Sequence, residues 1–314
     1  MLCTIHWLDL PINIRKEYFQ KVNNANLLQS DSYINALVKL QSQKSRYGLI
    51  KIDGKDAGIV WILEAGFLRN MLHAVILDRG PLWFGEYGSE KHFQGFCTAL
   101  RHEFPKRLGR VMRFIPEMEC APQIDEILKK HGFHKKSAGY QTIVLDLTQD
   151  EQALRADLRK NWLGSLKKAE KAGLQIEWDD QGLYLEECMK SYSLDKKKKG
   201  YNGPDVNIIR AVAEKSLPFG ETLIARAHYQ EQLVGTILIF CHGRTATYQI
   251  GWNTQDGREY GAHNFLLWQA VLYLKENGFT AFDLGGINDT EAKNVKKFKE
   301  GMGGRLVALP GLYT

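Results

Sequence analysis

The chain contains the same arrangement of apolar strands and a helix twice, and this repeat limits the folds open to it. The first copy has apolar runs on both sides of an Asp53-Gly54 pair, within residues 49–63. The second has apolar runs at 223–227 and 233–240, and each copy leads on to a helical segment that ends in a Gly-Phe pair. Apolar runs around such a turn predict a β-hairpin. The offset of about 150 to 175 residues therefore predicts a duplicated α/β unit.

The length fits this duplication. A chain of 314 residues suits two domains, each able to bury a core of its own. A strand at 142–145 is followed by an acidic helix start at 148–151, which predicts a boundary between them. We therefore expect domains over residues 1–146 and 147–314. The fold class is predicted as α/β (α+β), with a mixed central sheet flanked by helices in each domain.

The composition excludes several classes of protein. The five cysteines are odd in number and form no C-x-x-C pair, which argues against a disulfide framework and a zinc site and favours the cytoplasm. No apolar stretch approaches the roughly 20 residues of a membrane span. The motifs of P-loop nucleotide binding, zinc peptidases and serine hydrolases are missing from the sequence. We expect no metal and no resident cofactor.

Basic residues dominate one predicted helix. The formal charge of +6 favours a polyanionic partner or a phosphate-bearing substrate, and solubility alone is the alternative interpretation. From Leu154 to Ala169 apolar residues recur every four positions, which predicts one amphipathic helix that Gly173 ends. Its other faces carry a set of basic side chains that either bind tRNA phosphates or are only solvated: Arg155, Arg159, Lys160, Lys167, Lys168 and Lys171.

A second motif lies where a strand is expected to lead into a helix. The run Arg258-x-x-Gly261-x-His263 resembles the pyrophosphate loop of the GNAT acetyltransferases, which bind coenzyme A. The final position is normally a small residue, and a histidine there argues against ordinary coenzyme A binding. A plain helix N-terminus is the alternative interpretation. Together with Tyr248, these three residues are expected to line a substrate cleft.

Four segments, taken in order, are more specific than either motif. They are the basic helix, the run after Gly261, Phe282-Asp283-Leu284-Gly285-Gly286, and Phe298-Lys299 with the glycines that follow. This set resembles the Fem family, the aminoacyl-tRNA-dependent peptidyltransferases that build peptidoglycan cross-bridges. The resemblance implies two tandem GNAT-like domains. It also implies transfer of an aminoacyl group from charged tRNA to an amine of a UDP-linked or lipid-linked muropeptide, or of a related acceptor.

The resemblance places the Phe298-Lys299 pair at the reacting centre. An ammonium there stabilises the negative charge that develops on the carbonyl oxygen during aminolysis; a surface lysine is the alternative. Lys198 and Lys199, before Gly200-Tyr201, match the family's phosphate-binding position. A second such position falls on Asn35, so Lys39 is the closest substitute.

Two interpretations remain open for each of two further residues. Tyr248 either contacts the substrate or packs in the sheet. Asp283 either orients the incoming amine or only bonds the glycine turn that follows it.

Two other functions remain open beside the aminoacyltransferase. One is an acyl-coenzyme A-dependent GNAT N-acyltransferase, which keeps the fold and changes the donor. The other is a non-catalytic protein that binds tRNA or an anionic surface through its basic helix, and peripheral contact with a membrane is compatible with both enzymes. The sequence does not select the amino acid transferred.

Overall fold

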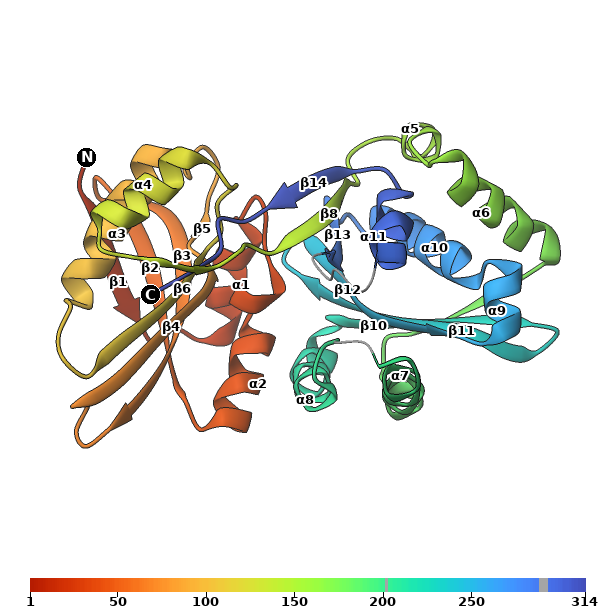
Figure 1. Cartoon of the computed structure of the whole chain (residues 1–314), viewed down its shortest axis with the longest axis horizontal. Helices are drawn as coiled ribbons and strands as arrows, with labels where there is room; N and C mark the ends of the chain where they lie inside the picture. Colours follow the sequence, from red (N-terminus) through yellow and green to blue (C-terminus); the bar gives the residue numbers. More distant parts are fainter. Residues whose placement is uncertain (201–202, 288–292) are drawn as a thin grey trace. The chain divides into compact units, whose positions relative to one another are not determined.

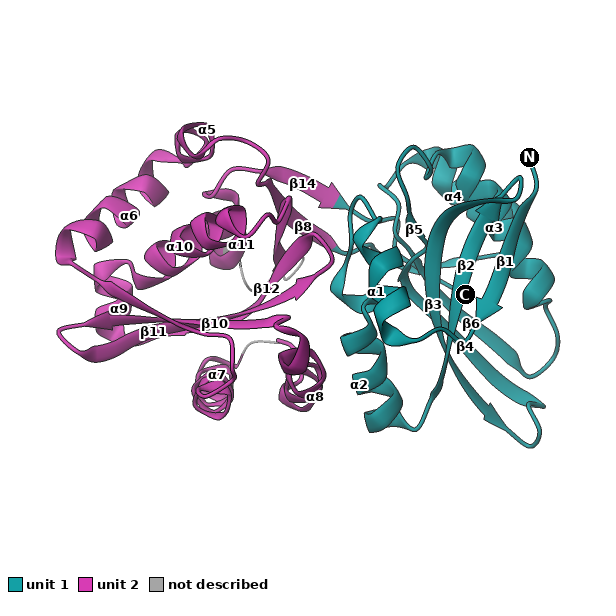
Figure 2. Cartoon of the chain, turned by 180° about the vertical axis from the view of Figure 1, so that it is seen from behind, with its two compact units in different colours: residues 1–140, 308–314 teal, residues 141–307 magenta. Residues whose placement is uncertain are grey.

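The computed structural model describes residues 1–200, 203–287 and 293–314. It divides into two compact units, one formed by residues 1–140 and 308–314 and the other by residues 141–307 (Figure 2). The second unit thus begins with the strand after which the sequence predicts a boundary, and the last residues of the chain belong to the first unit.

The first unit is a mixed sheet with helices on its faces (Figure 1). Its strand order is β1-β2-β3-β4-β6-β15-β7, with β5 paired to β3, and β4 and β6 are parallel. Its elements are β1 (Cys3–Leu8), α1 (Ile12–Gln20), η1 (Leu27–Gln29), α2 (Asp31–Gln41), β2 (Lys44–Ile52), β3 (Lys55–Phe67), β4 (Leu72–Gly80), β5 (Leu82–Trp83), α3 (Glu90–Glu103), β6 (Arg110–Pro116), α4 (Pro122–Lys130), β7 (Lys135–Ser137) and β15 (Leu312–Tyr313).

The second unit repeats this plan. Its strand order is β14-β8-β13-β12-β11-β10-β9, and β12 and β13 are parallel. Its elements are β8 (Gln141–Asp146), α5 (Glu151–Ala156), α6 (Lys160–Ala172), β9 (Gln175–Asp179), α7 (Leu185–Lys199), α8 (Val206–Ser216), η2 (Leu217–Phe219), β10 (Thr222–Tyr229), β11 (Gln232–His242), β12 (Thr245–Asn253), α9 (Gln255–Tyr260), α10 (Ala262–Glu276), β13 (Ala281–Gly286), α11 (Lys293–Glu300) and β14 (Arg305–Ala308). In each unit one long helix, α3 or α10, connects the parallel pair, so the predicted fold class and duplication are confirmed.

Both predicted hairpins are present. β2 and β3 are joined by Asp53 and Gly54 at φ of 48° and 81°, and β10 and β11 by Gln230 and Glu231 at 47° and 66°. Two successive left-handed residues match the right-handed twist of the strands on either side. The local turn chemistry therefore sets the register of both hairpins.

The predicted basic helix is two helices. Arg159 has an extended backbone (φ −60°, ψ 144°) between α5 and α6, and its N–H donates to the carbonyl of Gly301 at 2.9 Å. That long-range bond replaces the one a continuous helix would make, and the prediction of one helix was wrong. The apolar positions are buried as predicted, and Gly173 ends α6 at φ 71°.

Within the described part of the chain, none of the helices combines the length and the apolar character needed to cross a bilayer.

The C-terminal strand completes the core of the first unit, which yields a testable prediction. Tyr313 is 2% exposed, and its hydroxyl donates to Asp125 on α4. We expect Tyr313→Ala to lower the free energy of unfolding of this unit by about 3 to 5 kcal/mol, because a large buried ring is removed. The matched variant Tyr313→Phe loses only the hydrogen bond and should cost about 1 to 2 kcal/mol. Denaturant unfolding measures both; equal effects would contradict the packing argument.

Candidate active site

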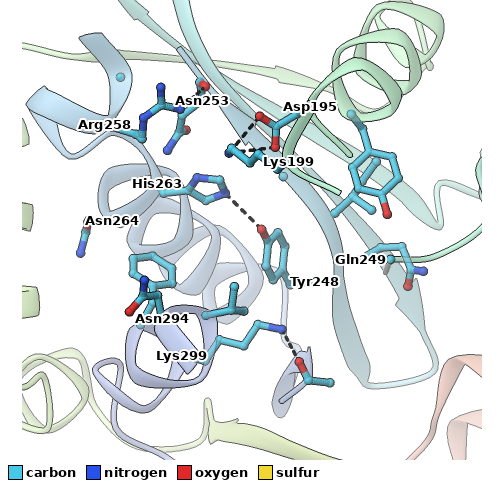
Figure 3. A pocket seen from close by; sticks show the side chains of 18 of the residues that line it. Asp195, Lys199, Tyr248, Gln249, Asn253, Arg258, His263, Asn264, Asn294 and Lys299 are labelled. Atoms are coloured by element: carbon cyan, nitrogen blue, oxygen red, sulfur yellow. Dashed lines mark hydrogen bonds and ion pairs between the residues drawn. The ribbon is translucent and has the colours of Figure 1, made fainter. Parts of the chain in front are cut away.

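A pocket of about 630 Å³ lies in the second unit, around the parallel pair β12–β13 (Figure 3). Parts of α7, α9, α10 and α11 complete its wall. It brings together most of the residues that the sequence singles out: Lys199, Tyr248, Arg258, Gly261, His263, Phe298 and Lys299.

Lys299 is buried in this wall. It is 7% exposed, while Lys296 and Lys297 on the same helix are exposed, so Lys299 is not a surface lysine. Its Nζ donates to the carbonyl of Gly286 at 3.0 Å and lies 5.6 Å from the centre of the Tyr248 ring. Burial lowers the pKa of Lys299 to about 8, and the charge of Asp283 opposes that shift. At neutral pH the side chain is therefore an ammonium that is poorly solvated and readily gives up its proton.

Asp283 acts on Lys299 through the glycine turn that Lys299 contacts. Its Oδ1 accepts from the N–H of Gly285 at 2.8 Å and from the hydroxyl of Thr142 on β8. Gly285 is left-handed at φ 75°, and a Cβ there would lie 2.9 Å from the carbonyl oxygen of Tyr248. Asp283 is not part of the pocket wall. Of the two roles predicted for it, the structure shows the contact with the glycine turn, which positions the carbonyl that Lys299 contacts.

Tyr248 and His263 form a hydrogen-bonded pair at the centre of the pocket. The Tyr248 hydroxyl and His263 Nε2 are 3.1 Å apart, and Figure 3 shows the Tyr248 ring between His263 and the Lys299 ammonium. Phe298 meets the imidazole edge to face at 6.0 Å. Burial, followed by the positive charges of Lys199 and Lys299, lowers the pKa of His263 to about 4, although Asp195 opposes this. His263 is thus neutral at physiological pH, and it can donate or accept a hydrogen bond.

This pair depends on a glycine that the sequence analysis did not single out. A Cβ on Gly251 of β12 would lie 2.3 Å from His263 Nε2 and 2.5 Å from the Tyr248 hydroxyl oxygen. Only glycine leaves room for both side chains. A glycine inside a strand signals a close approach of another group, but it does not say which group.

The Arg258–Gly261 segment is helical rather than a simple turn. Arg258 lies on α9, and its guanidinium donates to the carbonyl of Asn253 at 3.1 Å and to Gln255 Oε1 at 2.7 Å. Gly261, at φ 74°, ends α9 and begins α10. A Cβ there would lie 2.7 Å from the carbonyl oxygen of Ser165, so this glycine brings α6 close to α10. The predicted strand-turn-helix order missed the short helix.

The predicted phosphate-binding lysines are dispersed. Lys199 borders the pocket and pairs with Asp195 at 2.9 Å. Lys198 is exposed on the same helix and is not part of the wall, and Lys39 is exposed on α2 of the first unit. Gly200 caps α7 at φ 69°, while Tyr201 lies outside the described residues.

The predicted tRNA-binding residues fall into two groups. Arg155 pairs with Glu170 at 2.9 Å and Arg159 with Glu300 at 3.3 Å, so acidic neighbours reduce their charge. The remaining four are exposed on α6: Lys160, Lys167, Lys168 and Lys171. The α6 lysines therefore make up the basic face that is open to a polyanion.

Residues 1–200, 203–287 and 293–314 contain no group of three or more His, Cys, Asp or Glu side chains arranged to hold a metal ion.

Comparisons with known proteins agree with this geometry. Residues 156–299 match the family model described as an acetyltransferase (GNAT) domain, and every described residue of the pocket wall falls within that segment. The second unit therefore carries a GNAT acyltransferase domain, as the sequence predicts. No curated protein sequence matches the chain significantly.

Solved structures extend the likeness to the whole chain. FemX is similar at a TM-score of 0.79 with 14% identity, covering 98% of this chain and 96% of FemX. A conserved protein of unknown function from Bacteroides thetaiotaomicron has a TM-score of 0.62 at 12% identity, covering 99% and 98%. A tandem GNAT protein from the clavulanic acid biosynthesis pathway has a TM-score of 0.51 at 10% identity, covering 98% and 97%. The predicted Fem-like tandem GNAT fold is confirmed.

The role of Gly251 can be tested directly. We expect Gly251→Ala to displace the His263 imidazole toward water, at a cost of about 1 to 3 kcal/mol in the free energy of unfolding. The pKa of His263 should then rise from about 4 toward its ordinary value. NMR titration of the histidine ring protons measures this pKa.

Gly164 provides the control, because a Cβ there meets nothing within 4 Å. Gly164→Ala lies inside α6 and should stabilise the protein by about 0.5 to 1 kcal/mol without changing the His263 titration. An unchanged His263 pKa in Gly251→Ala would show that the glycine does not hold this pair together.

Proposed function

We propose that this protein is a Fem-like aminoacyltransferase. It takes an aminoacyl group from charged tRNA and forms an amide on an amine of a peptidoglycan precursor or a related acceptor, in the cytoplasm. The observation that carries this proposal is a buried ammonium, Lys299, in the pocket of a GNAT domain whose chain shares its whole fold with FemX.

The chemistry needs charge stabilisation rather than a covalent enzyme intermediate. The acceptor nitrogen attacks the ester carbonyl, and a C–N bond forms while the carbonyl oxygen becomes an oxyanion. The bond to the ribose oxygen then breaks, and the proton lost by the amine leaves with that oxygen. An ammonium held in a poorly solvated wall stabilises the oxyanion without reorganisation. Lys299 supplies this charge, and Gly286 holds the ammonium in place.

Two other features support an acyl ester as the substrate. His263 is neutral and bonded to Tyr248, so the pair can donate a hydrogen bond to a carbonyl or hydroxyl oxygen without adding a charge. The α6 lysines offer a basic face with the salt-dependent affinity that phosphates require. The acceptor is UDP-linked, lipid-linked or another amine.

An acyl-coenzyme A N-acyltransferase is the second candidate, because the matched family model is an acetyltransferase domain. Two observations weigh against it. His263 projects into the pocket where the family motif has a small residue, and Arg258 is already bonded to Asn253 and Gln255. Saturable binding of coenzyme A in a calorimetric titration would favour this candidate over the tRNA-dependent one.

The proposal predicts a tRNA-dependent product that requires Lys299. Incubation with a mixture of charged tRNAs and muropeptide acceptors, both UDP-linked and lipid-linked, should yield an aminoacylated acceptor detectable by mass spectrometry. Lys299→Met should lower the rate at least about a hundredfold, because one oxyanion-stabilising group is lost.

Lys296→Met is the matched control, since Lys296 is exposed on the same helix. It should retain the wild-type rate. Absence of product with every amino acid and both acceptors would refute the proposal, and product formation that does not depend on Lys299 would refute its mechanism. A non-catalytic tRNA-binding protein would bind charged tRNA and give no product.

The buried ammonium also predicts a gain in stability. Lys299→Met removes a charge that the fold desolvates, so it should raise the free energy of unfolding at pH 7 by about 1 to 3 kcal/mol. The folded lysine loses its proton at about pH 8, whereas the unfolded lysine holds it to about 10.5. Wild-type stability therefore rises with pH across this window, and the advantage of Lys299→Met should shrink there. Thermal unfolding of both proteins at pH 7 and across the interval between these two pKa values measures the effect. A destabilised variant at pH 7 would contradict it.

A further inference from the structure

The first unit exposes a cluster of large apolar side chains at one end of its sheet. Six of the fourteen large hydrophobic residues exposed in the described structure lie there, and each is more than half exposed. They come from the β3–β4 hairpin and from the segment that leads into β6. We call this set the hairpin-tip patch: Phe67, Leu68, Met71, Leu72, Leu108 and Val111.

The register of the sheet makes the patch continuous. Phe67 pairs with Leu72 across the hairpin, and Val111 pairs with Ala74, two residues further along β4. Residues that pair, or that lie two apart on one strand, share a face of the sheet. His73 points to the other side, where it is buried against Phe104 at the end of α3. The apolar residues of the three strands therefore form one surface opposite the core.

The two loops at this end are fastened to each other. Arg107 donates to the carbonyl oxygen of Met71 at 3.1 Å and to that of Asn70. The N–H of His73 donates to the carbonyl of Gly109 at 2.8 Å. Leu108, which is 99% exposed, is thereby held beside the hairpin. These hydrogen bonds hold the two loops together, so the patch is one ordered surface.

The surrounding charge has one sign. Segments 65–72 and 105–111 contain no aspartate or glutamate. Of their four basic residues, Arg69 and Arg107 are exposed at the hairpin tip and in the loop beside it. Arg110 donates to His73 on the opposite face, and Lys106 lies against Gly132 after α4. Such a surface combines apolar contact with attraction to negative charge. Its complement is a surface that is apolar inside and anionic outside.

The hairpin tip is also strained. Leu68, Arg69 and Asn70 all have left-handed backbones, at φ of 49°, 53° and 66°. Left-handed conformations are unfavourable for residues with a branched or long side chain, and they are retained where something else requires them. Here the strain directs a leucine and an arginine outward together, where they make no contribution to the core.

We propose that the hairpin-tip patch docks the protein onto an anionic phospholipid bilayer. The apolar side chains enter the boundary between headgroups and acyl chains while the basic residues contact the lipid phosphates, as in other interfacial anchors. This site lies in the first unit and is independent of the acyl transfer proposed for the second.

Other occupants fit less well. A symmetric dimer through this patch would bring the same basic residues of two copies together, and like charges repel. A nucleic acid backbone would match the arginines, but it offers nothing to six exposed apolar side chains. Anionic lipid complements both the positive charge and the apolar surface of the hairpin-tip patch.

Vesicle co-sedimentation tests the proposal with the full chain. The probe is phosphatidylcholine vesicles with about 30% phosphatidylglycerol, which carry a strongly negative surface, and pure phosphatidylcholine vesicles are the comparison. The wild-type protein should bind the anionic vesicles, and added salt should weaken that binding. Leu108→Asp should weaken it at least about tenfold, because an apolar anchor is lost and a negative charge is added.

Two further variants introduce a residue that tolerates the left-handed backbone of the hairpin tip. Asparagine tolerates a left-handed φ, so Leu68→Asn and Arg69→Asn should fold normally and separate the apolar contribution from the electrostatic one. Arg69→Asn should weaken binding roughly fivefold and reduce its salt dependence. Leu183→Asp and Lys55→Gln, exposed elsewhere, are the matched controls and should bind as the wild type does.

The proposal fails if the wild type does not bind anionic vesicles, or if the patch variants bind as well as the controls. It also fails if sedimentation velocity shows a dimer that Leu108→Asp dissociates, because the patch would then be a self-association interface. Circular dichroism of each variant confirms that lost binding is not lost folding.

Discussion

The hydrogen bond between the Lys299 ammonium and the carbonyl of Gly286 is the contact on which the candidate site depends. A lysine is rarely buried without a partner, because the charged form is expensive to desolvate. Here the partner is a backbone carbonyl whose position is fixed by the turn of Gly285. Asp283 and Thr142 hold that turn, so β8 and β13 together determine where the ammonium lies.

The electrostatics of the pocket follow from this arrangement. Burial lowers the pKa of His263 most, and the charges of Lys199 and Lys299 lower it further against the opposing effect of Asp195, which is paired with Lys199. The result is a neutral imidazole in a positive surrounding. Such a pocket favours negative charge that develops on a substrate oxygen over removal of a proton by a charged base. The pKa of His263, about 4, makes the imidazole a weak base and a serviceable hydrogen-bond partner.

Local patterns in the sequence predicted turns correctly, whereas contacts between residues far apart in the chain could not be predicted from them. The Asp53-Gly54 pair predicted a hairpin because its turn geometry is set by two adjacent residues. The break at Arg159 depends on the carbonyl of Gly301, far along the chain, and no periodicity reveals it. Thr142 lies 141 residues from Asp283, so its contact left no local signal. The sequence identified Lys299 through a resemblance, but its burial and its bond to Gly286 required the fold.

The two sheets share one plan, but the first repeat is not one continuous piece of chain, because it takes a strand from residues 312–313. In the second sheet, the neighbour of β13 is β8, which precedes all the other elements of its unit. In the first sheet, the neighbour of β6 is β15, which comes from residues 312–313. A fragment cut after residue 146 would lack Tyr313 in its core and would carry β8, which pairs with β13. Because β15 pairs with a strand almost 200 residues earlier, closure of the first sheet is the most non-local step in the fold. The order of folding is therefore constrained: the second sheet can form from contiguous chain, and the first is complete only when the C-terminal strand has joined it.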